Sequence, residues 1–166
     1  MHKELRTGKR QAIKLKKEIN KIGGIKMKGF VCKTCGYIAF DEAPEKCPVC
    51  MSPKSVFNEQ DTVKTSADEG PKEKHVPVIK IVKKCGLVGE GCTDIHVRIG
   101  DILHPMEPAH FIVFVDFYVD RKVVSRVRLT PDTNPAASAH IKAGSGKLTV
   151  IEFCNIHGYW INETDL

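Results

Sequence analysis

Four of the seven cysteines form two C-x-x-C pairs, a spacing typical of metal-binding knuckles. The pairs are Cys32-Lys-Thr-Cys35 and Cys47-Pro-Val-Cys50, with eleven residues between them. The tight turn of each pair points both sulfurs at one ion, and Gly36 relieves the turn after Cys35. Four thiolates around one ion make the tetrahedral site that selects zinc or iron. The spacing therefore predicts a metal at these cysteines and leaves open which of the two is bound.

A second set of candidate ligands combines four histidines with one cysteine. Its members are His75, His104, His110, Cys154 and His157. The two prolines within 105–109 make regular structure there impossible, and Cys154-Asn-Ile-His157 can give one sulfur and one nitrogen to a single ion. Four imidazoles and a thiolate exceed the four ligands of a structural zinc and suit a transition metal such as iron. The alternative is a set of solvent-facing loop histidines with a buried Cys154.

Short strands are the elements that must position this second set. Apolar alternation and turn residues predict strands over 76–82, 94–99, 111–119, 123–129 and 147–153. The residues expected to point inward are Ile95, Val97 and Ile99 in the second strand and Val123, Val127 and Leu129 in the fourth. Strands at this spacing predict a mainly β protein with an antiparallel β-sandwich of immunoglobulin type. Loops at one end of such a sandwich can bring distant ligands together.

Basic residues are concentrated at the N-terminus. Residues 1–28 carry ten Lys or Arg and two acidic residues, a net charge of +8, whereas the other 138 residues carry 16 basic and 18 acidic residues, a net charge of −2. Apolar residues recur at helical spacing within this segment, and Gly23-Gly24 is a stop signal. These apolar residues are Ala12, Leu15, Ile19 and Ile22. We therefore expect a basic helical arm at 1–28, with its helix over 9–22.

The remainder of the chain divides into a small metal domain, a linker and the sandwich. Residues 29–58 are too few to bury a core and need a metal as a staple. Residues 59–72 are polar, contain Gly70-Pro71 and predict a linker that allows the two modules some freedom. The sandwich is expected to occupy 73–166.

Length and composition exclude several classes of protein. A chain of 166 residues is too short for a barrel enzyme or for most dinucleotide-binding enzymes. No apolar run reaches membrane-spanning length and the N-terminus does not resemble a signal peptide, so a cytoplasmic protein without membrane contact is expected. Reduced thiols in the cytoplasm favour free thiols over a disulfide at Cys85 and Cys92, which flank a glycine-rich turn. His96 and His140 have no partner at ligand spacing and are expected to lie outside any site.

The first cysteine segment is similar to a known small domain. Val31-Cys-Lys-Thr-Cys-Gly-Tyr37, followed by Ala43-Pro-Glu-Lys-Cys-Pro-Val-Cys50 and Phe57, resembles the rubredoxin-like domain found at the end of rubrerythrins. The resemblance implies a one-electron Fe(Cys)4 centre at Cys32, Cys35, Cys47 and Cys50, with zinc as the other possible metal. Such a centre would relay or store electrons for a second iron.

Three motifs of the second set resemble the superoxide reductase family, which comprises desulfoferrodoxin and neelaredoxin. They are Glu73-Lys-His-Val-Pro-Val78, His104-Pro-Met-Glu-Pro-Ala-His110 and Cys154-Asn-Ile-His-Gly-Tyr-Trp160, in the family's order. The resemblance implies a non-haem iron with four equatorial histidines and an axial cysteine. By motif position these ligands are His75, His104, His110, His157 and Cys154. The chain departs from the family at Phe111-Ile-Val-Phe114, where a Trp is frequent, and 85–92 has no counterpart in it.

The resemblance further implies the reduction of superoxide by one electron to hydrogen peroxide. Lys74 is expected to attract the anion and to hold a water that delivers a proton. Glu73 is a possible sixth ligand of the resting ferric iron, and Asn155 is expected to orient the cysteine loop. The implied partners are superoxide, a rubredoxin or similar electron donor, and further copies of the chain in a dimer or tetramer.

Two alternative functions remain at this point. A metal-stapled nucleic-acid-binding protein would use the basic arm, but no aromatic residues interleave with its lysines as base stacking requires, and the set of histidines and Cys154 is left unexplained. No nucleic acid is therefore expected as a partner. A pure electron carrier would have a sandwich iron without an open position.

Overall fold

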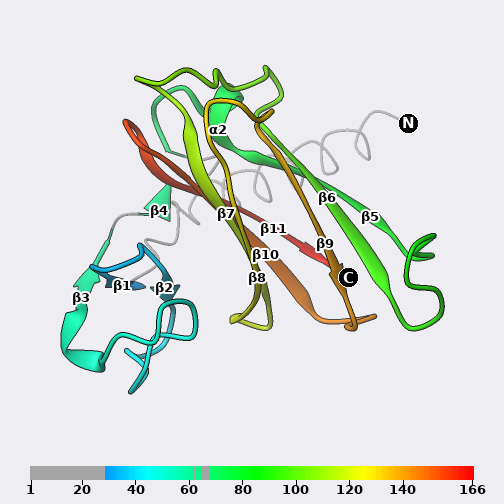
Figure 1. Ribbon diagram of the computed structural model, residues 1–166, viewed down its shortest axis with the longest axis horizontal. Coiled ribbons are helices and arrows are strands. Elements are labelled where there is room, and N and C mark those ends of the chain that lie inside the picture. Colours follow the sequence, from blue (N-terminus) through cyan, green and yellow to red (C-terminus); the bar gives the residue numbers. More distant parts are fainter. Residues whose placement is uncertain (1–28, 62, 65–67) are drawn as a thin grey trace, which may run out of the picture.

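The computed structural model describes residues 29–61, 63–64 and 68–166. The helical arm predicted at 1–28 lies outside the described residues. The described chain consists mainly of strands, which form a small sheet at one corner and a two-layered sandwich beside it (Figure 1). None of the described helices is long and apolar enough to cross a membrane.

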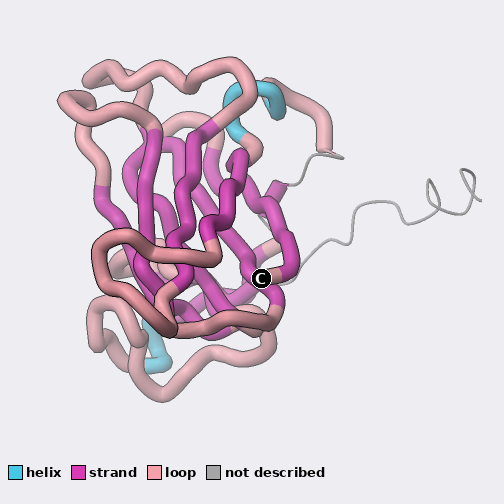
Figure 2. Tube along the Cα trace, turned by 90° about the vertical axis from the view of Figure 1, so that its right-hand side faces the viewer, coloured by secondary structure: helices cyan, strands magenta, loops and turns pink. Residues whose placement is uncertain are grey.

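The sandwich consists of a five-stranded sheet in the order β4-β11-β10-β7-β8 and a three-stranded sheet in the order β5-β6-β9. The strands are β4 (Val63–Lys64), β5 (Pro77–Val82), β6 (Thr93–Ile99), β7 (Ile112–Val119), β8 (Lys122–Arg128), β9 (Ala136–Ile141), β10 (Lys147–Cys154) and β11 (Gly158–Asp165). Neighbouring strands are antiparallel except β11 and β4, which are parallel. The predicted mainly β fold with an immunoglobulin-like antiparallel sandwich is confirmed. Loops gather at the two ends of the strands (Figure 2).

The core between the two sheets follows from alternation along the strands. Ile95, Val97 and Ile99 of β6 are at most 3% exposed, whereas His96 and Arg98 between them are exposed. The buried residues that pack with these three include Ile112, Val115, Phe117, Leu148 and Val150. Burial of each such side chain contributes about 1.5–3 kcal/mol. The core therefore fixes the sheet register that places the loops at each end.

One inward assignment on β8 is wrong. Val127 and Leu129 contact the core between the sheets as predicted, but Val123 packs on the outer face of the larger sheet. Phe117 pairs with Ser125, whereas the next residue of β7 pairs with Val123. One residue of β8 is thus extra, and a bulge of one residue reverses the side-chain alternation.

Two regular strands escaped the sequence prediction. β9 has the sequence Ala-Ala-Ser-Ala-His-Ile, and alanine is depleted in strands, so its propensity is weak. Its alternation is nevertheless complete, because Ala137, Ala139 and Ile141 are buried and the residues between them are exposed. β11 begins with apolar residues and ends with Asn-Glu-Thr-Asp, which hides its length.

The small sheet has the order β2-β1-β3 and packs on the outer face of the larger sheet. Its strands are β1 (Gly29–Cys32), β2 (Ile38–Ala39) and β3 (Phe57–Gln60), and the 3-10 turn η1 (Lys54–Val56) precedes β3. Tyr37 stacks on Tyr118 of β7 with ring centroids 6.0 Å apart, and the Tyr118 hydroxyl donates to the Ile38 carbonyl at 3.0 Å. An ion pair joins Arg121 to Asp41 at the rim of this contact.

The segment predicted as a free linker is attached to both modules. β3 extends to Gln60, and the two residues of β4 pair with Tyr159 and Trp160 of β11. The short helix α2 (Lys72–His75) then leads into β5. His75, expected at the start of the first strand of the sandwich, is the last residue of this turn. The expected freedom between the modules is therefore wrong, because strand pairing holds the connection in place.

Candidate metal centres

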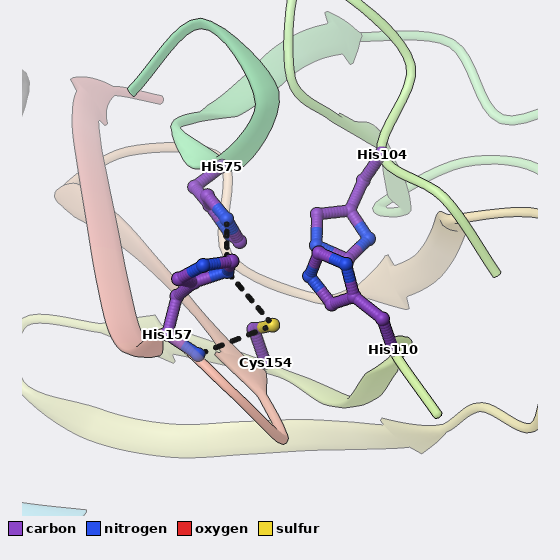
Figure 3. Close-up of side chains that lie close together, drawn as sticks. All are labelled: His75, His104, His110, Cys154 and His157. Carbon is purple, nitrogen blue, oxygen red and sulfur yellow. Dashed lines mark hydrogen bonds between the residues drawn. The ribbon is translucent and has the colours of Figure 1, made fainter. Parts of the chain in front are cut away.

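Four histidines form a closed ring at one end of the sandwich (Figure 3). Neighbouring ring centroids are 4.6–4.9 Å apart in the order His75, His104, His110, His157 and back to His75. His75 and His110 lie across the ring from each other at 6.4 Å. The Cys154 sulfur joins this group, and the five donor atoms lie within 4.8 Å of one another. The structure thus brings together all five residues of the second predicted set, which we call the histidine ring.

Each member of the ring comes from a segment at the same end of the strands. His75 ends α2 just before β5, His104 and His110 lie in the β6–β7 loop, Cys154 ends β10, and His157 lies in the turn before β11. Asn155 ties two of these segments together, because its side-chain nitrogen donates to the Ala109 carbonyl and its oxygen accepts from the Phe111 amide, both at 3.0 Å. Asn155 therefore joins the histidine loop to the cysteine loop.

The hydrogen bonds of the imidazoles select which nitrogen faces the centre. His75 Nδ1 lies 3.0 Å from Glu152 Oε1, and His104 Nδ1 lies 2.6 Å from the Pro105 carbonyl. The Pro105 carbonyl can only accept, so His104 Nδ1 carries the proton, and His75 Nδ1 carries it when it donates to Glu152. Each Nε2 then has a lone pair for a metal. The Nε2 atoms of His104 and His110 are buried without a hydrogen-bond partner in the described structure. A metal ion would satisfy these atoms.

The spacing of the donor atoms fits one ion. His75 Nε2 and His157 Nδ1 are 3.1 Å apart, and His157 Nδ1 is 3.7 Å from Cys154 Sγ. Nitrogen ligands about 2.1 Å from a metal on adjacent corners of a square lie about 3 Å apart. The spacing therefore fits a single metal ion that four nitrogens and one sulfur would hold.

Burial keeps the histidines in the neutral state that binds a metal. It lowers the pKa of His75 to about 3 and that of His104 to about 4, so both imidazoles are neutral at pH 7. Burial also raises the pKa of Cys154, whose sulfur accepts a 3.4 Å hydrogen bond from the His157 amide. A buried thiol of this kind loses its proton when it binds a metal ion.

Three further residues lie beside the ring, and two of them, Glu152 and Lys64, carried no sequence prediction. Glu152 is fully buried and holds His75 through the bond described above; a lone carboxylate in an apolar strand was the available signal. Trp160 stacks on His75 with centroids 5.1 Å apart. Lys64 donates to the His157 carbonyl at 3.1 Å and lies 5.3 Å from the Trp160 ring. Lys64 was hidden in a segment predicted as a linker, and only the pairing of β4 places it here.

Glu73 and Lys74 are exposed on α2 beside the ring. Glu73 does not belong to the group of donor atoms that lie together. The charge of Lys74 is near enough to add to burial in lowering the pKa of His104. Gly100 lets the backbone after β6 pack closely against α2, because a Cβ at this residue would lie 2.7 Å from the Lys74 backbone. This backbone contact holds α2, which carries both charged residues, beside the ring.

The four cysteines of the small sheet form a second group, which we call the four-cysteine centre. Cys32 Sγ and Cys50 Sγ are 3.7 Å apart, and Cys35 Sγ and Cys47 Sγ are 3.6 Å apart. Sulfurs about 2.3 Å from a tetrahedral metal would be about 3.8 Å apart, so this group also fits one ion. Gly36 has a φ of 74°, which agrees with its predicted part in the turn.

The two groups are connected by direct contacts between the modules. Gly36 follows Cys35, and its carbonyl accepts a 3.1 Å hydrogen bond from the Tyr159 hydroxyl. Tyr159 is two residues after His157. Arg126 donates to the Cys35 carbonyl at 2.6 Å and pairs with the buried Asp116. A Cβ at Gly36 would lie 2.9 Å from the Tyr159 oxygen, so only glycine permits this approach.

Comparisons with known proteins match both modules. The family model for desulfoferrodoxin matches residues 67–163, and that for the rubredoxin-like domain of rubrerythrin matches 30–58. The chain is 32% identical over 140 residues to a desulfoferrodoxin of Syntrophotalea carbinolica, covering 83% of this chain and 97% of that protein. It is 37% identical over 119 residues to a superoxide reductase of Pyrococcus abyssi, covering 64% and 97%. The solved superoxide reductase of Nanoarchaeum equitans superposes with a TM-score of 0.52 at 32% identity, covering 63% and 99%.

Proposed function

The chain belongs to the desulfoferrodoxin family, and from this membership we propose that it is a superoxide reductase. The reaction adds one electron and two protons to superoxide and yields hydrogen peroxide. The observation that carries the proposal is the ring of four histidines above Cys154, whose buried Nε2 atoms at His104 and His110 have no other partner in the described structure.

The residues of the ring would hold an iron ion. His75, His104 and His110 would bind it through Nε2, His157 through Nδ1 and Cys154 through Sγ. Iron so bound supplies a one-electron reductant with one coordination position free for a small anion. Glu152 and the Pro105 carbonyl orient two of the imidazoles, and Trp160 covers the His75 ring.

Capture of the superoxide anion depends on positive charges near the ring, because residues 29–166 as a whole carry a net charge of −2 and do not attract an anion. Lys74 at the mouth of the site attracts superoxide and holds a water that delivers a proton. Lys64, which donates to the His157 carbonyl, adds positive charge beside the ring. Burial lowers the pKa of His157, and the charges of His110 and Lys64 lower it further. Glu73, exposed on α2 beside the ring, would serve as a further ligand of the oxidised iron.

Electrons reach the ring from the four-cysteine centre of the same chain. The route runs from Cys35 to the Gly36 carbonyl, across the hydrogen bond to Tyr159, and along the backbone to His157. The four-cysteine centre holds iron in this role, since zinc does not change oxidation state. A rubredoxin or similar protein supplies the electron to the four-cysteine centre. The chain works in the cytoplasm, and its copies form a homodimer or homotetramer.

The test compares His110→Ala with His96→Ala in the full chain loaded with iron. His96 is an exposed histidine on β6 bonded to Ser138, outside the ring. Pulses of superoxide should give one peroxide per superoxide with the wild-type chain and with His96→Ala, and no catalysed peroxide with His110→Ala. Cys154→Ser should remove the thiolate-to-iron absorption band. One peroxide for every two superoxides, with oxygen released, would show dismutation and contradict the proposal.

A further inference from the structure

A third group of metal-binding side chains lies at the opposite end of the smaller sheet. Cys85, Cys92, Asp94 and His140 place one donor atom each within 4.8 Å of one another. The histidine ring lies beside the first residue of β5 and this group beyond its last, and six residues of strand span about 20 Å. The group is therefore separate from the ring and has no part in the proposed function.

Strand register explains why His140 has partners that its sequence position hides. His140 of β9 is directly opposite Asp94 of β6, and Cys92 is two residues before Asp94. The end of β5 pairs with Asp94 as well, and the chain returns to β6 through the loop that contains Cys85. The expectation that His140 has no partner at ligand distance is wrong, because Asp94 and Cys85 lie beside its Nδ1. The sequence hid this because β9 itself was not predicted.

The distances suit a single tetrahedral ion. His140 Nδ1 lies 2.7 Å from Asp94 Oδ1, 3.3 Å from Cys85 Sγ and 3.9 Å from Cys92 Sγ, and Cys92 Sγ lies 3.6 Å from Asp94 Oδ1. Ligands at about 2.0–2.3 Å from a tetrahedral zinc are about 3.3–3.8 Å apart. The three longer distances thus lie near the edges of one coordination tetrahedron, and the shortest needs to open by about 0.6 Å.

The cysteine geometry repeats that of the histidine ring. The Val88 amide donates to Cys85 Sγ at 3.2 Å, as the His157 amide donates to Cys154 Sγ at 3.4 Å, three residues after the sulfur in both turns. Cys85 and Cys92 are free thiols, each 7% exposed. Amide hydrogen bonds of this kind stabilise a thiolate, which is the form that binds a metal.

The loop between the two cysteines has little packing of its own. Leu87 and Val88 are 80% and 64% exposed. A Cβ at Gly86, Gly89 or Gly91 would meet no atom within 4 Å. A loop that buries so little apolar surface gains most from a cross-link at its base.

We propose that Cys85, Cys92, Asp94 and His140 bind a zinc ion that closes this loop. Two thiolates, an imidazole and a carboxylate fill all four positions of a tetrahedral site, the arrangement of a structural zinc. The bound group carries a net charge of −1, which Lys83 and Lys84 beside the pocket at Cys85 offset. The ion contributes stability to the sandwich and takes no part in electron transfer.

The test measures zinc and iron per chain in protein refolded with both metals and passed through a weak chelator. The double variant Cys85→Ser/Cys92→Ser should hold about one zinc fewer per chain than the wild type, with its iron unchanged. His140→Ala should weaken zinc binding at least about tenfold. His96→Ala, which removes a histidine from the same sheet, should keep the wild-type zinc content. The comparison between variants is unaffected by zinc in the four-cysteine centre, since all of them retain that centre.

A second measurement covers the case in which the double variant fails to fold. Cobalt added to the wild-type chain with its iron sites filled should give absorption bands of a tetrahedral thiolate complex, and zinc should remove them. Equal zinc affinity in the wild type and His140→Ala would overturn the proposal. So would a Cys85–Cys92 disulfide identified by peptide mass mapping of the wild type under non-reducing conditions. Both results are independent of superoxide turnover.

Discussion

The four-cysteine centre and the histidine ring both bring metal-binding side chains together, but they do so in opposite ways. All four ligands of the four-cysteine centre lie within 32–50, in two turns that bring their own sulfurs together. The ring takes its ligands from 75 to 157, and a sandwich core of buried strands must form before they meet. In the first region the metal supports the fold, whereas in the second the fold supports the metal. The difference predicts how each responds to loss of its ion.

Removal of the metals from both centres should give the largest difference between the two regions. We expect amide hydrogen exchange to lose protection over 29–60 and to keep it over the strands of the sandwich, because metal binding supplies about 10–16 kcal/mol to small structural metal domains. Refilling with metal should restore the protection. Equal loss in both regions would mean that the two modules fold as one unit.

Arg126 tests how firmly the two regions are joined. Arg126→Met leaves the Asp116 carboxylate buried without its partner and removes the bond to the Cys35 carbonyl, so we expect a loss of about 3–5 kcal/mol in unfolding free energy. Denaturant titration measures this loss. Arg98→Met, which removes a half-exposed arginine from β6, should change the unfolding free energy by less than about 1 kcal/mol.

Glu152 tests the claim that the sandwich prepares the ring for its metal. Glu152→Leu leaves His75 Nδ1 without an acceptor, and we expect iron affinity to fall about 10–100-fold. Glu152→Gln keeps an oxygen in the same place and should hold iron more tightly than the leucine variant. Competition with a coloured chelator measures both. Equal affinities in the two variants would mean that the hydrogen bond does not orient the imidazole.

Lys74 tests a property that only the ring needs, the capture of an anion. Lys74→Ala should slow the second-order reaction with superoxide roughly threefold to tenfold at low ionic strength, and the effect should shrink as salt is added. Lys80→Ala removes the same charge from an exposed position on β5 and should leave the rate nearly unchanged. If Lys74→Ala and Lys80→Ala slowed the reaction equally, the effect would come from the net charge of the protein and not from the position of Lys74.

Sequence patterns were sufficient to group both sets of candidate ligands that the structure brings together, for a reason that differs between them. The spacing of the four cysteines is a local geometry, and the turn at Gly36 follows from it. The ring ligands are far apart in sequence, so residue type and loop context only made their meeting plausible, and the family motifs made it specific. Strands with strong alternation, such as β6, were predictable for the same local reason.

The rest depends on pairings that no local pattern encodes. The bulge that turns Val123 outward arises from the β7–β8 register, and the partners of His140 arise from the β6–β9 register. Lys64 joins the site only because two residues pair with β11. Each of these is a long-range contact whose free energy is shared among many residues.

The pairing of β4 with β11 has a kinetic consequence. A donor centre on a separate protein must find the ring by diffusion, so its electron arrives at a rate that falls with dilution. A centre held by β4 is present at an effective concentration on the order of millimolar or higher, however few copies of the chain exist. Reduction of the ring then becomes a first-order event, and the slow bimolecular encounter is confined to the recharging of the four-cysteine centre between encounters with superoxide.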